Sequence, residues 1–258
     1  MIQLSVVIIT LNEERNIARC LNSVKEIADE IVIIDSYSTD NTESICKSYG
    51  ARVIRHPFKG YGYQKNFANA QATNDHILSL DADEVLSNEL LQSVKEVKEN
   101  FNADGYTMNR LTNYAGKWIH HSGWYPDVKL RLFNRKKGEW TGLLIHEKYE
   151  MYAGSKVKHL KGDLLHYSFS SVESHKKQSE KFAQLGAEAY FEKGKKAPML
   201  KIIVAPIVRF IRDYFFNLGF LDGKEGFIIC RISARSTYSK YRKLRDLYKE
   251  QDKAKASS

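Results

Sequence analysis

The first 85 residues alternate short apolar runs with segments in which apolar side chains recur every three or four positions. The apolar runs, which predict strands, cover residues 4–9, 31–34, 51–54 and 77–80. The segments with helical spacing cover residues 13–26, 41–49 and 63–72. Asn12 is suited to cap the first of these helices. Continuous apolar strands separated by helices are typical of a parallel sheet covered on both faces, so this region predicts an open α/β sheet.

The pattern becomes mixed beyond residue 85. A helix is predicted over 88–100, and a long polar helix over 173–193. Further strands are predicted over residues 105–111, 128–133, 142–145 and 162–167. The segment 113–127 is dense in Tyr, Trp and His, which is typical of a surface loop that contacts a ligand or packs on the core as a lid.

Polar side chains follow three of the predicted strands where each one ends. Thr10, Asn12 and Glu13 follow the first strand, Asp35 ends the second, and Asp81-Ala82-Asp83 follows the fourth. Ligands of open α/β sheets bind at the carboxyl ends of the strands. Two carboxylates two residues apart suit a hard divalent cation that bridges a diphosphate. Asp35 and Asp40 have a second interpretation, as caps of the helix that begins near residue 41.

Composition limits the class of protein. The chain has 258 residues, of which 43% are hydrophobic, so it can bury a substantial core. Its three cysteines form no CxxC pair, which argues against a disulfide scaffold and against a metal site made of cysteines. The N-terminus has no basic segment before its apolar run, so we expect a cytoplasmic protein.

The net charge of +9 is located at one end of the chain. Residues 192–258 hold 16 basic and 7 acidic side chains, whereas the preceding 191 residues hold 24 of each. A basic end of this kind attracts an anionic partner. No nucleic-acid recognition motif accompanies the charge, so we expect no nucleic-acid partner.

Four ordered motifs resemble those of the inverting nucleotide-sugar glycosyltransferases of family 2. They are VVIITLNE at 6–13, IIDSYSTDNT at 33–42, Lys65-Asn66, and LDADE at 80–84. The resemblance implies an α/β protein with the GT-A fold: a Rossmann-like nucleotide-binding sheet, a mixed acceptor-side half and a C-terminal helical extension. It implies a catalytic domain at 1–170 and a helical, basic, amphipathic region at 171–258.

The resemblance also implies roles for single residues. Those that would contact the nucleotide sugar are Thr10, Asn12, Glu13, Asp35, Lys65 and Asp81. Asp35 would accept from the uracil ring, and Lys65 stands where the family usually has an arginine. Those that would hold a divalent cation, Mn²⁺ or Mg²⁺, are Asp83, Asp81 and His166. Imidazole beside carboxylate favours Mn²⁺, although a histidine on an apolar strand is often structural.

An inverting transferase needs a general base for the acceptor hydroxyl. The family usually places an acidic residue after a strand and a glycine turn, where this chain has His146-Glu147. The resemblance therefore implies that Glu147 is the base. Asp127, in the sequence GWYPD at 123–127, is the rival, and His146 could be the titrating group instead.

Further motifs resemble one subgroup, the lipopolysaccharide-core beta-glucosyltransferases. They are YGYQKNFA at 61–68, GWYPD at 123–127, RLF at 131–133 and His146-Glu147. The subgroup implies transfer of glucose from UDP-glucose to an inner-core heptose. The alternatives are another lipid-linked or cell-surface glycan as acceptor, or an inactive nucleotide-sugar-binding protein. An inactive protein would be expected to lack the carboxylates, which are present.

The charge pattern of residues 198–216 gives independent information about where the acceptor is located. The apolar residues of this region are interrupted by Lys201, Arg209, Arg212 and Asp213, which fall on one side of a helix. Each charge would cost about 2.5–3.5 kcal/mol in a spanning helix, so an interfacial position is expected instead. We therefore expect a peripheral protein on the inner face of the plasma membrane, with a lipid-linked saccharide acceptor. Packing of this helix onto the catalytic domain is the alternative.

Overall fold

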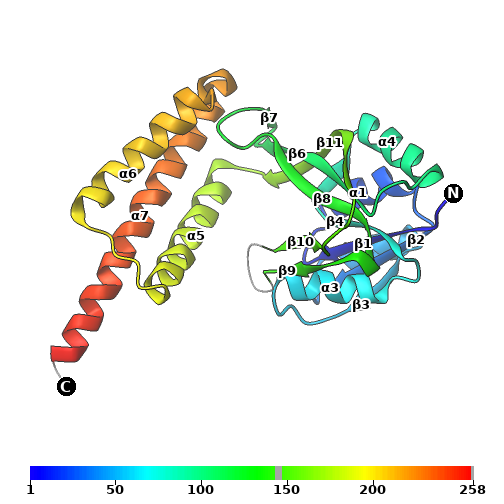
Figure 1. Ribbon diagram of the computed structural model, residues 1–258, viewed down its shortest axis with the longest axis horizontal. Coiled ribbons are helices and arrows are strands. Elements are labelled where there is room, and N and C mark those ends of the chain that lie inside the picture. Colours follow the sequence, from blue (N-terminus) through cyan, green and yellow to red (C-terminus); the bar gives the residue numbers. More distant parts are fainter. Residues whose placement is uncertain (143–146, 257–258) are drawn as a thin grey trace. The chain divides into compact units, whose positions relative to one another are not determined.

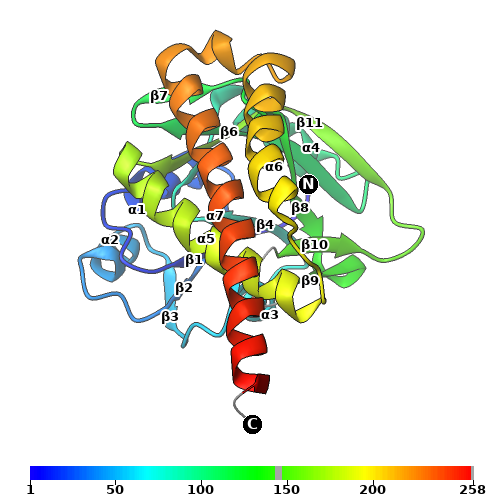
Figure 2. The same cartoon turned by 90° about the vertical axis from the view of Figure 1, so that its left-hand side faces the viewer.

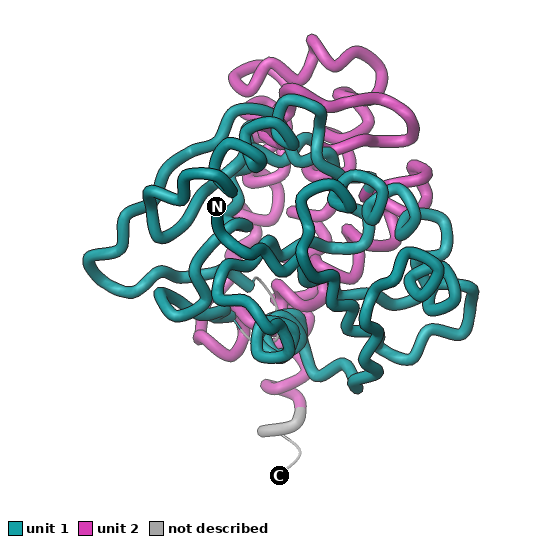
Figure 3. Tube along the Cα trace, turned by 90° about the vertical axis from the view of Figure 1, so that its right-hand side faces the viewer, with its two compact units in different colours: residues 1–111, 126–167 teal, residues 112–125, 168–258 magenta. Residues whose placement is uncertain are grey.

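The computed structural model describes residues 1–142 and 147–256, with side chains up to residue 253. The chain divides into two compact units (Figure 3). Unit 1 comprises Met1–Leu111 and Pro126–Tyr167, and unit 2 comprises Thr112–Tyr125 and Ser168–Ser258. The compact units therefore group the aromatic segment with the C-terminal helices, whereas the predicted catalytic domain, 1–170, includes it.

Unit 1 is built on a mixed sheet with the order β3-β2-β1-β4-β8-β6-β11-β5. Its four parallel strands are β1 (Leu4–Thr10), β2 (Glu30–Asp35), β3 (Arg52–Arg55) and β4 (His76–Asp81). The remaining strands are β5 (Glu84–Leu86), β6 (Gly105–Tyr114), β8 (Asp127–Asn134) and β11 (Val157–Phe169). β8 pairs antiparallel with both β4 and β6. The parallel half and the mixed half are both as predicted.

Alternate residues of the parallel strands point to opposite faces of this sheet, which is drawn as a ribbon in Figure 1, and enter two different core clusters. On one face, Val6 and Ile8 pack with three helices, α1 (Ile17–Val24), α2 (Thr42–Ser48) and α4 (Asn88–Glu99). On the other face, Val7 packs with α3 (Tyr61–Gln71) and a hairpin of β9 (Gly138–Thr141) and β10 (Lys148–Met151). A short 3₁₀ turn, η1 (Arg135–Lys137), leads into this hairpin. Both faces are thus covered.

One detail differs from the predictions, and another falls outside the described residues. The first helix begins at Ile17 with Asn16 as its N-cap, so the prediction of Asn12 as the cap is wrong. The strand predicted over 142–145 falls mainly on residues 143–146, which lie outside the described residues, and the hairpin strands β9 and β10 flank them.

Unit 2 contains β7 (Lys117–Ile119) and three long helices, α5 (Val172–Glu192), α6 (Met199–Ile211) and α7 (Gly223–Ala256). α7 lies between α5 and α6 (Figures 1 and 2). A buried cluster joins the three helices through Ala187, Ile202 and Leu244. No helix in the described part of the chain is long and apolar enough to cross a bilayer.

The charged stripe predicted on α6 forms, but its acid is buried. Asp213 lies in the π-helical turn η2 (Arg212–Phe216) and is 1% exposed. It accepts from the Nε atoms of both Arg209 and Arg212, the latter at 2.9 Å. Both arginines are thereby held to a buried carboxylate. Reversal of either arginine to glutamate would place a second carboxylate against Asp213.

Candidate active site

The register of the parallel strands brings the predicted residues to one edge of the sheet. Thr10 at the end of β1 is opposite Asp35 at the end of β2, and Ile9 is opposite Asp81 at the end of β4. The three polar side chains therefore meet at the carboxyl ends of neighbouring strands, as the sequence predicts.

Asp35 closes the turn that follows β2. Its carboxylate is buried and accepts from the amide and the hydroxyl of Ser38, the amide at 2.8 Å. Asn12 joins this turn, because its amide donates to the Ser38 hydroxyl and its Oδ1 accepts from the Thr39 amide, both at 2.8 Å. The two loops therefore form one bonded surface.

Asp40 and Glu13 complete the link between these loops. The Asp40 carboxylate accepts from the amide of Thr42, the first residue of α2, at 3.0 Å, although the N-cap position of that helix is Asn41 and not Asp40. The Thr42 hydroxyl accepts from the Glu13 amide at 2.8 Å. Burial raises the pKa of Glu13, and the nearby carboxylates of Asp83, Asp40 and Asp81 add to the increase. A cation or a hydroxyl donor next to Glu13 would therefore stabilise its carboxylate.

Asp81 is held between two buried cations. Its Oδ1 lies 3.0 Å from Lys65 Nζ, and its Oδ2 accepts from Arg131 at 2.8 Å. Arg131 also donates to Glu84 Oε1 at 2.7 Å, and the other oxygen of Glu84 accepts from the Asp81 amide. Burial alone would raise the pKa of Asp81, but Lys65 and Arg131 outweigh it and hold that pKa well below its usual range. The two cations therefore favour the ionised form of Asp81.

Asp83 and His166 face each other across the turn between β4 and β5. His166 Nε2 is 3.2 Å from Asp83 Oδ2. The pairing of β11 with β5 sets this contact, since it places His166 opposite Glu84, the residue after Asp83. The other ring nitrogen, Nδ1, is buried and has no hydrogen-bond partner in the described part of the chain. Within that part, no group of three or more His, Cys, Asp or Glu side chains is placed to hold a metal ion.

The two candidate bases lie in different surroundings. Glu147 contacts Lys65, with Oε1 at 3.0 Å from Nζ, and so joins the group around Asp81. Asp127 accepts from Arg110 at 2.7 Å and from Lys129 at 2.9 Å. Burial would raise the pKa of Asp127, but these two cations outweigh it and lower that pKa. The third candidate, His146, lies outside the described residues.

Comparisons with known proteins identify the family. The model of Glycosyl transferase family 2 matches residues 5–162, which is more than half of the chain. An uncharacterized glycosyltransferase of Rickettsia typhi is 32% identical over 255 residues, which cover 95% of this chain and 87% of that protein. The chain belongs to glycosyltransferase family 2. It has the GT-A fold of that family, with the parallel and mixed halves described above.

A further relative of this family 2 glycosyltransferase has a more specific name. The lipopolysaccharide core biosynthesis glycosyltransferase LpsC of Rhizobium meliloti is 29% identical over 252 residues, which cover 92% of this chain and 93% of that protein. The chain is thus similar along nearly its whole length, including the C-terminal helices, to a protein named for lipopolysaccharide core synthesis.

Solved structures are less similar to this chain than these two relatives are. S. aureus TarS aligns over 70% of this chain and 39% of its own, with 16% identity and a TM-score of 0.44. Glucosyl-3-phosphoglycerate synthase of Mycobacterium tuberculosis, solved with Mn²⁺, UDP and glucosyl-3-phosphoglycerate, aligns over 43% of this chain and 44% of its own, with 25% identity and a TM-score of 0.36. The matched part spans less than half of each of those chains, so the family assignment rests on the sequence.

Several residues of the candidate site are not predicted by the sequence. Glu84 and Arg131 are almost fully buried and link β5 to β8, while Arg110 joins Glu84 to Asp127. The Trp140 ring lies 4.6 Å from Lys65 Nζ. A usable signal for Arg131 was its position in the apolar strand 128–133, where a charge requires a buried partner.

The aromatic segment is packed within unit 2. Trp124 contacts the rings of Tyr114, Phe169 and His175. The buried Asp222 accepts from the amides of His120 and His121, each at 3.1 Å. Trp124 therefore fits the packed-lid interpretation better than an open stacking surface.

Proposed function

We propose that this family 2 glycosyltransferase is an inverting enzyme that moves glucose from UDP-glucose to a saccharide acceptor of the lipopolysaccharide inner core. The observation that carries the proposal is the group of Asp81, Asp83, Lys65 and Glu147 at the carboxyl end of β4. Similarity to LpsC supports the acceptor class. Another lipid-linked or cell-surface glycan is the second candidate acceptor.

In this proposal Glu147 takes the proton from the acceptor hydroxyl as the sugar carbon is attacked from the side opposite the diphosphate. Glu147 belongs to the same group of side chains as Asp81, which supports its placement near the reacting atoms. Asp127 is less suited, because Arg110 and Lys129 lower its pKa and occupy both of its oxygens. In this proposal Asp127 holds Arg110 beside Glu84.

The donor's nucleotide would lie along the bonded loops after β1 and β2. Thr10, whose hydroxyl is buried without a partner among the described residues, is available to a ligand there. Asn12 and Glu13 shape the same loop, and Asp35 would accept from the uracil ring. Asp81 would contact the ribose, and Lys65 would attract the diphosphate as a single-point contact.

The donor set suits a divalent cation at Asp83 and His166. His166 Nε2 and Asp83 Oδ2 lie 3.2 Å apart and both side chains are partly exposed, so the two atoms could share a cation with further ligands from diphosphate and water. Asp81 is a poorer ligand, since Lys65 and Arg131 already contact its oxygens. A bound Mn²⁺ or Mg²⁺ would neutralise charge on the departing diphosphate.

Unit 2 supports a lipid-linked acceptor. A run of large apolar side chains on α6, η2 and the 3₁₀ turn η3 (Gly219–Asp222) is exposed. They include Leu200, Ile203, Ile207, Val208, Ile211, Phe215, Phe216 and Leu221. An exposed apolar face of this extent is typical of an interaction with a membrane or another protein. The basic composition of residues 192–258 favours an anionic membrane surface.

A donor screen tests the reaction. The purified chain is incubated with different nucleotide sugars and Mn²⁺, and release of nucleoside diphosphate is measured with and without lipopolysaccharide core acceptors. UDP-glucose should be preferred, Asp83→Ala should lose the metal-dependent rate, and the product should have inverted anomeric configuration. A retained configuration, or preference for another donor, would refute the corresponding part of the proposal.

Variants of the candidate bases assign the proton acceptor. Glu147→Gln should lower kcat by about 10²–10⁴ with little change in UDP affinity, because it keeps the shape and removes the base. Asp127→Asn should be milder, since that carboxylate has a positioning role. The reverse order of effects would assign the base to Asp127.

A further inference from the structure

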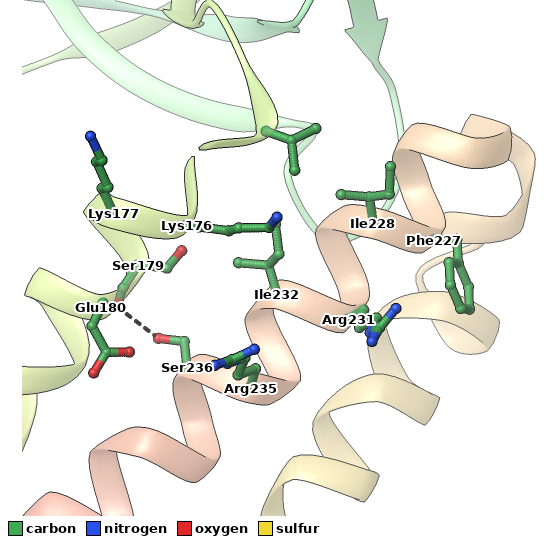
Figure 4. Close-up of a pocket in the computed structure, with 11 residues that line it drawn as sticks. Lys176, Lys177, Ser179, Glu180, Phe227, Ile228, Arg231, Ile232, Arg235 and Ser236 are labelled. Atoms are coloured by element: carbon green, nitrogen blue, oxygen red, sulfur yellow. Dashed lines mark hydrogen bonds between the residues drawn. The ribbon is translucent and has the colours of Figure 1, made fainter. Parts of the chain in front are cut away.

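A groove of about 620 Å³ lies between α5 and α7 of unit 2 (Figure 4). Its apolar lining comes from Val172 of α5 and from Phe227, Ile228 and Ile232 of α7. A polar link crosses the helices within it, where the Ser236 hydroxyl donates to the Ser179 carbonyl at 3.1 Å. The groove therefore has an apolar floor that water solvates poorly.

The rim of the groove is cationic. Lys176 of α5 points toward α7, and Arg231 and Arg235 extend from α7 one turn apart (Figure 4). Neither arginine forms a hydrogen bond or ion pair with any residue that the structure describes. The single acid of the lining, Glu180, already pairs with Lys243 at 3.0 Å. Lys176 pairs with Glu173 at 3.6 Å, but both side chains are exposed. The two arginines are thus available to an anionic ligand, and Lys176 could exchange its exposed partner for one.

The apolar floor continues onto the exposed face of α6 and η2. The Phe227 ring contacts Phe210 and Tyr214, with ring centres 5.9 and 5.8 Å away. Phe227 is itself exposed, as are the neighbouring Phe215 and Phe216. Phe227 therefore links the lining of the groove to the exposed apolar side chains of α6 and η2.

We propose that this groove binds one anionic phospholipid, with its phosphate on Arg231, Arg235 and Lys176 and an acyl chain on the apolar floor. Guanidinium groups bind phosphate through paired hydrogen bonds, which explains two arginines one turn apart. A free phosphate or a phosphorylated sugar would use the rim but not the floor. The inference extends the proposed membrane partner to a defined lipid site and does not depend on transferase activity.

The test uses lipids that are soluble as monomers, so that binding to a membrane surface does not contribute. Dihexanoyl-phosphatidylglycerol, dihexanoyl-phosphatidylcholine and inorganic phosphate are titrated into the full chain below the critical micelle concentration, and affinity is measured by calorimetry. The phosphatidylglycerol should bind at least about tenfold more tightly than the other two, because the choline cation of phosphatidylcholine is repelled by the cationic rim and inorganic phosphate has no acyl chain for the floor. Equal affinity for the two lipids, or for phosphate alone, would overturn the proposal.

Paired variants locate the binding. Arg231→Gln with Arg235→Gln should weaken phosphatidylglycerol binding about tenfold or more. Lys193→Gln with Lys196→Gln removes the same charge from the turn after α5 and should change nothing. Ser179→Trp should weaken phosphatidylglycerol binding, because the indole would fill the groove. The backbone carbonyl of residue 179 would still accept from Ser236. If the control pair weakens binding equally, the groove is not the site.

Donor hydrolysis separates this inference from the proposed function. All of these variants should release UDP from UDP-glucose at the unmodified rate, since none of the residues lies in unit 1. Loss of lipid binding with intact hydrolysis supports the groove. Lipid binding by a chain that hydrolyses no donor would support the groove and refute the proposed reaction.

Discussion

Arg131 is a buried guanidinium that holds two carboxylates together. It is 3% exposed and contacts Asp81 and Glu84, of which Glu84 is fully buried. Burial would lower the pKa of Arg131, but Glu84 and Asp81 outweigh it, so the residue stays charged. Removing one partner of a buried ion pair is costly because the other charge is left uncompensated.

We therefore expect Arg131→Leu to lower the free energy of unfolding by about 3–5 kcal/mol. Urea denaturation followed by circular dichroism measures the change. Lys95→Ala is the control, because its ion pair with Glu26 is exposed to solvent and its loss should change the stability little. Equal stability of the two variants would contradict the buried network.

His175 provides a test by pH. It is buried and contacts the Tyr114 hydroxyl at 3.1 Å, and burial lowers its pKa to about 4. The unfolded histidine, with a pKa near 6.5, binds a proton more readily than the folded one. Stability should therefore fall as the pH drops from about 6.5 to about 4, by up to about 3 kcal/mol. Thermal melts of His175→Gln should lack this part of the pH dependence, and an identical pH profile would contradict it.

The sequence predicts the residues at strand ends better than their partners. Asp35, Asp81 and Asp83 are predictable because each follows an apolar run directly. The contact between Lys65 and Glu147 joins residues 82 positions apart, and no local pattern encodes such a pairing. The ionised state of Asp81 depends on contacts with Lys65 and Arg131, which are distant in sequence, so it could not be predicted without the structure.

At the scale of elements, loop contacts explain where a predicted helix is shortened. Helical spacing predicts a start at residue 13, but Asn12 bonds to the loop after β2 and Glu13 bonds to Thr42 at the start of α2. These contacts hold the chain in a turn until Asn16, with Asn12 at a positive φ of 54°. Tertiary contacts here override the periodicity of the segment.

Asp222 anchors the aromatic segment within unit 2. Its carboxylate accepts from the amides of His120 and His121 and from the Ser122 hydroxyl, and it is 3% exposed. Asp222→Ala would leave these donors without partners, so we expect the segment 117–125 to open locally. Amide hydrogen exchange at His120 and His121 should accelerate by at least about tenfold. Glu250→Ala, an exposed change on α7, is the control. Unchanged exchange would mean that other contacts hold the segment.

At the scale of the whole chain, charge and apolar surface are separated along the sequence. The first 191 residues are balanced in charge, whereas the C-terminal part is basic and carries exposed apolar side chains. The sequence predicts both properties of that part, because each follows from composition and helical spacing. It does not predict that Asp213 is buried, since this depends on the π-helical turn in which Asp213 lies.

Membrane attachment is therefore best tested on the apolar face of α6. Ile203 and Ile207 lie one turn apart and are each 55% exposed, so polar replacements there remove little packing. Reversing Arg209 or Arg212 would instead place a carboxylate against the buried Asp213. Ile203→Ser with Ile207→Ser should lower the partition coefficient on phosphatidylglycerol vesicles at least about tenfold, since each apolar side chain that enters the interface contributes about 1.5–3 kcal/mol.

Vesicle sedimentation at several salt concentrations measures this partitioning. Rising salt should weaken binding of the unmodified chain, because it screens the basic residues, but the loss caused by the serine pair should persist. Tyr152→Ser with Val157→Ser, two exposed positions of unit 1, should bind as the unmodified chain does. If the unmodified chain ignores anionic vesicles, or if the α6 variant binds them equally well, the apolar face has another occupant. The proposed membrane partner would then be wrong, while donor hydrolysis by unit 1 would be unaffected.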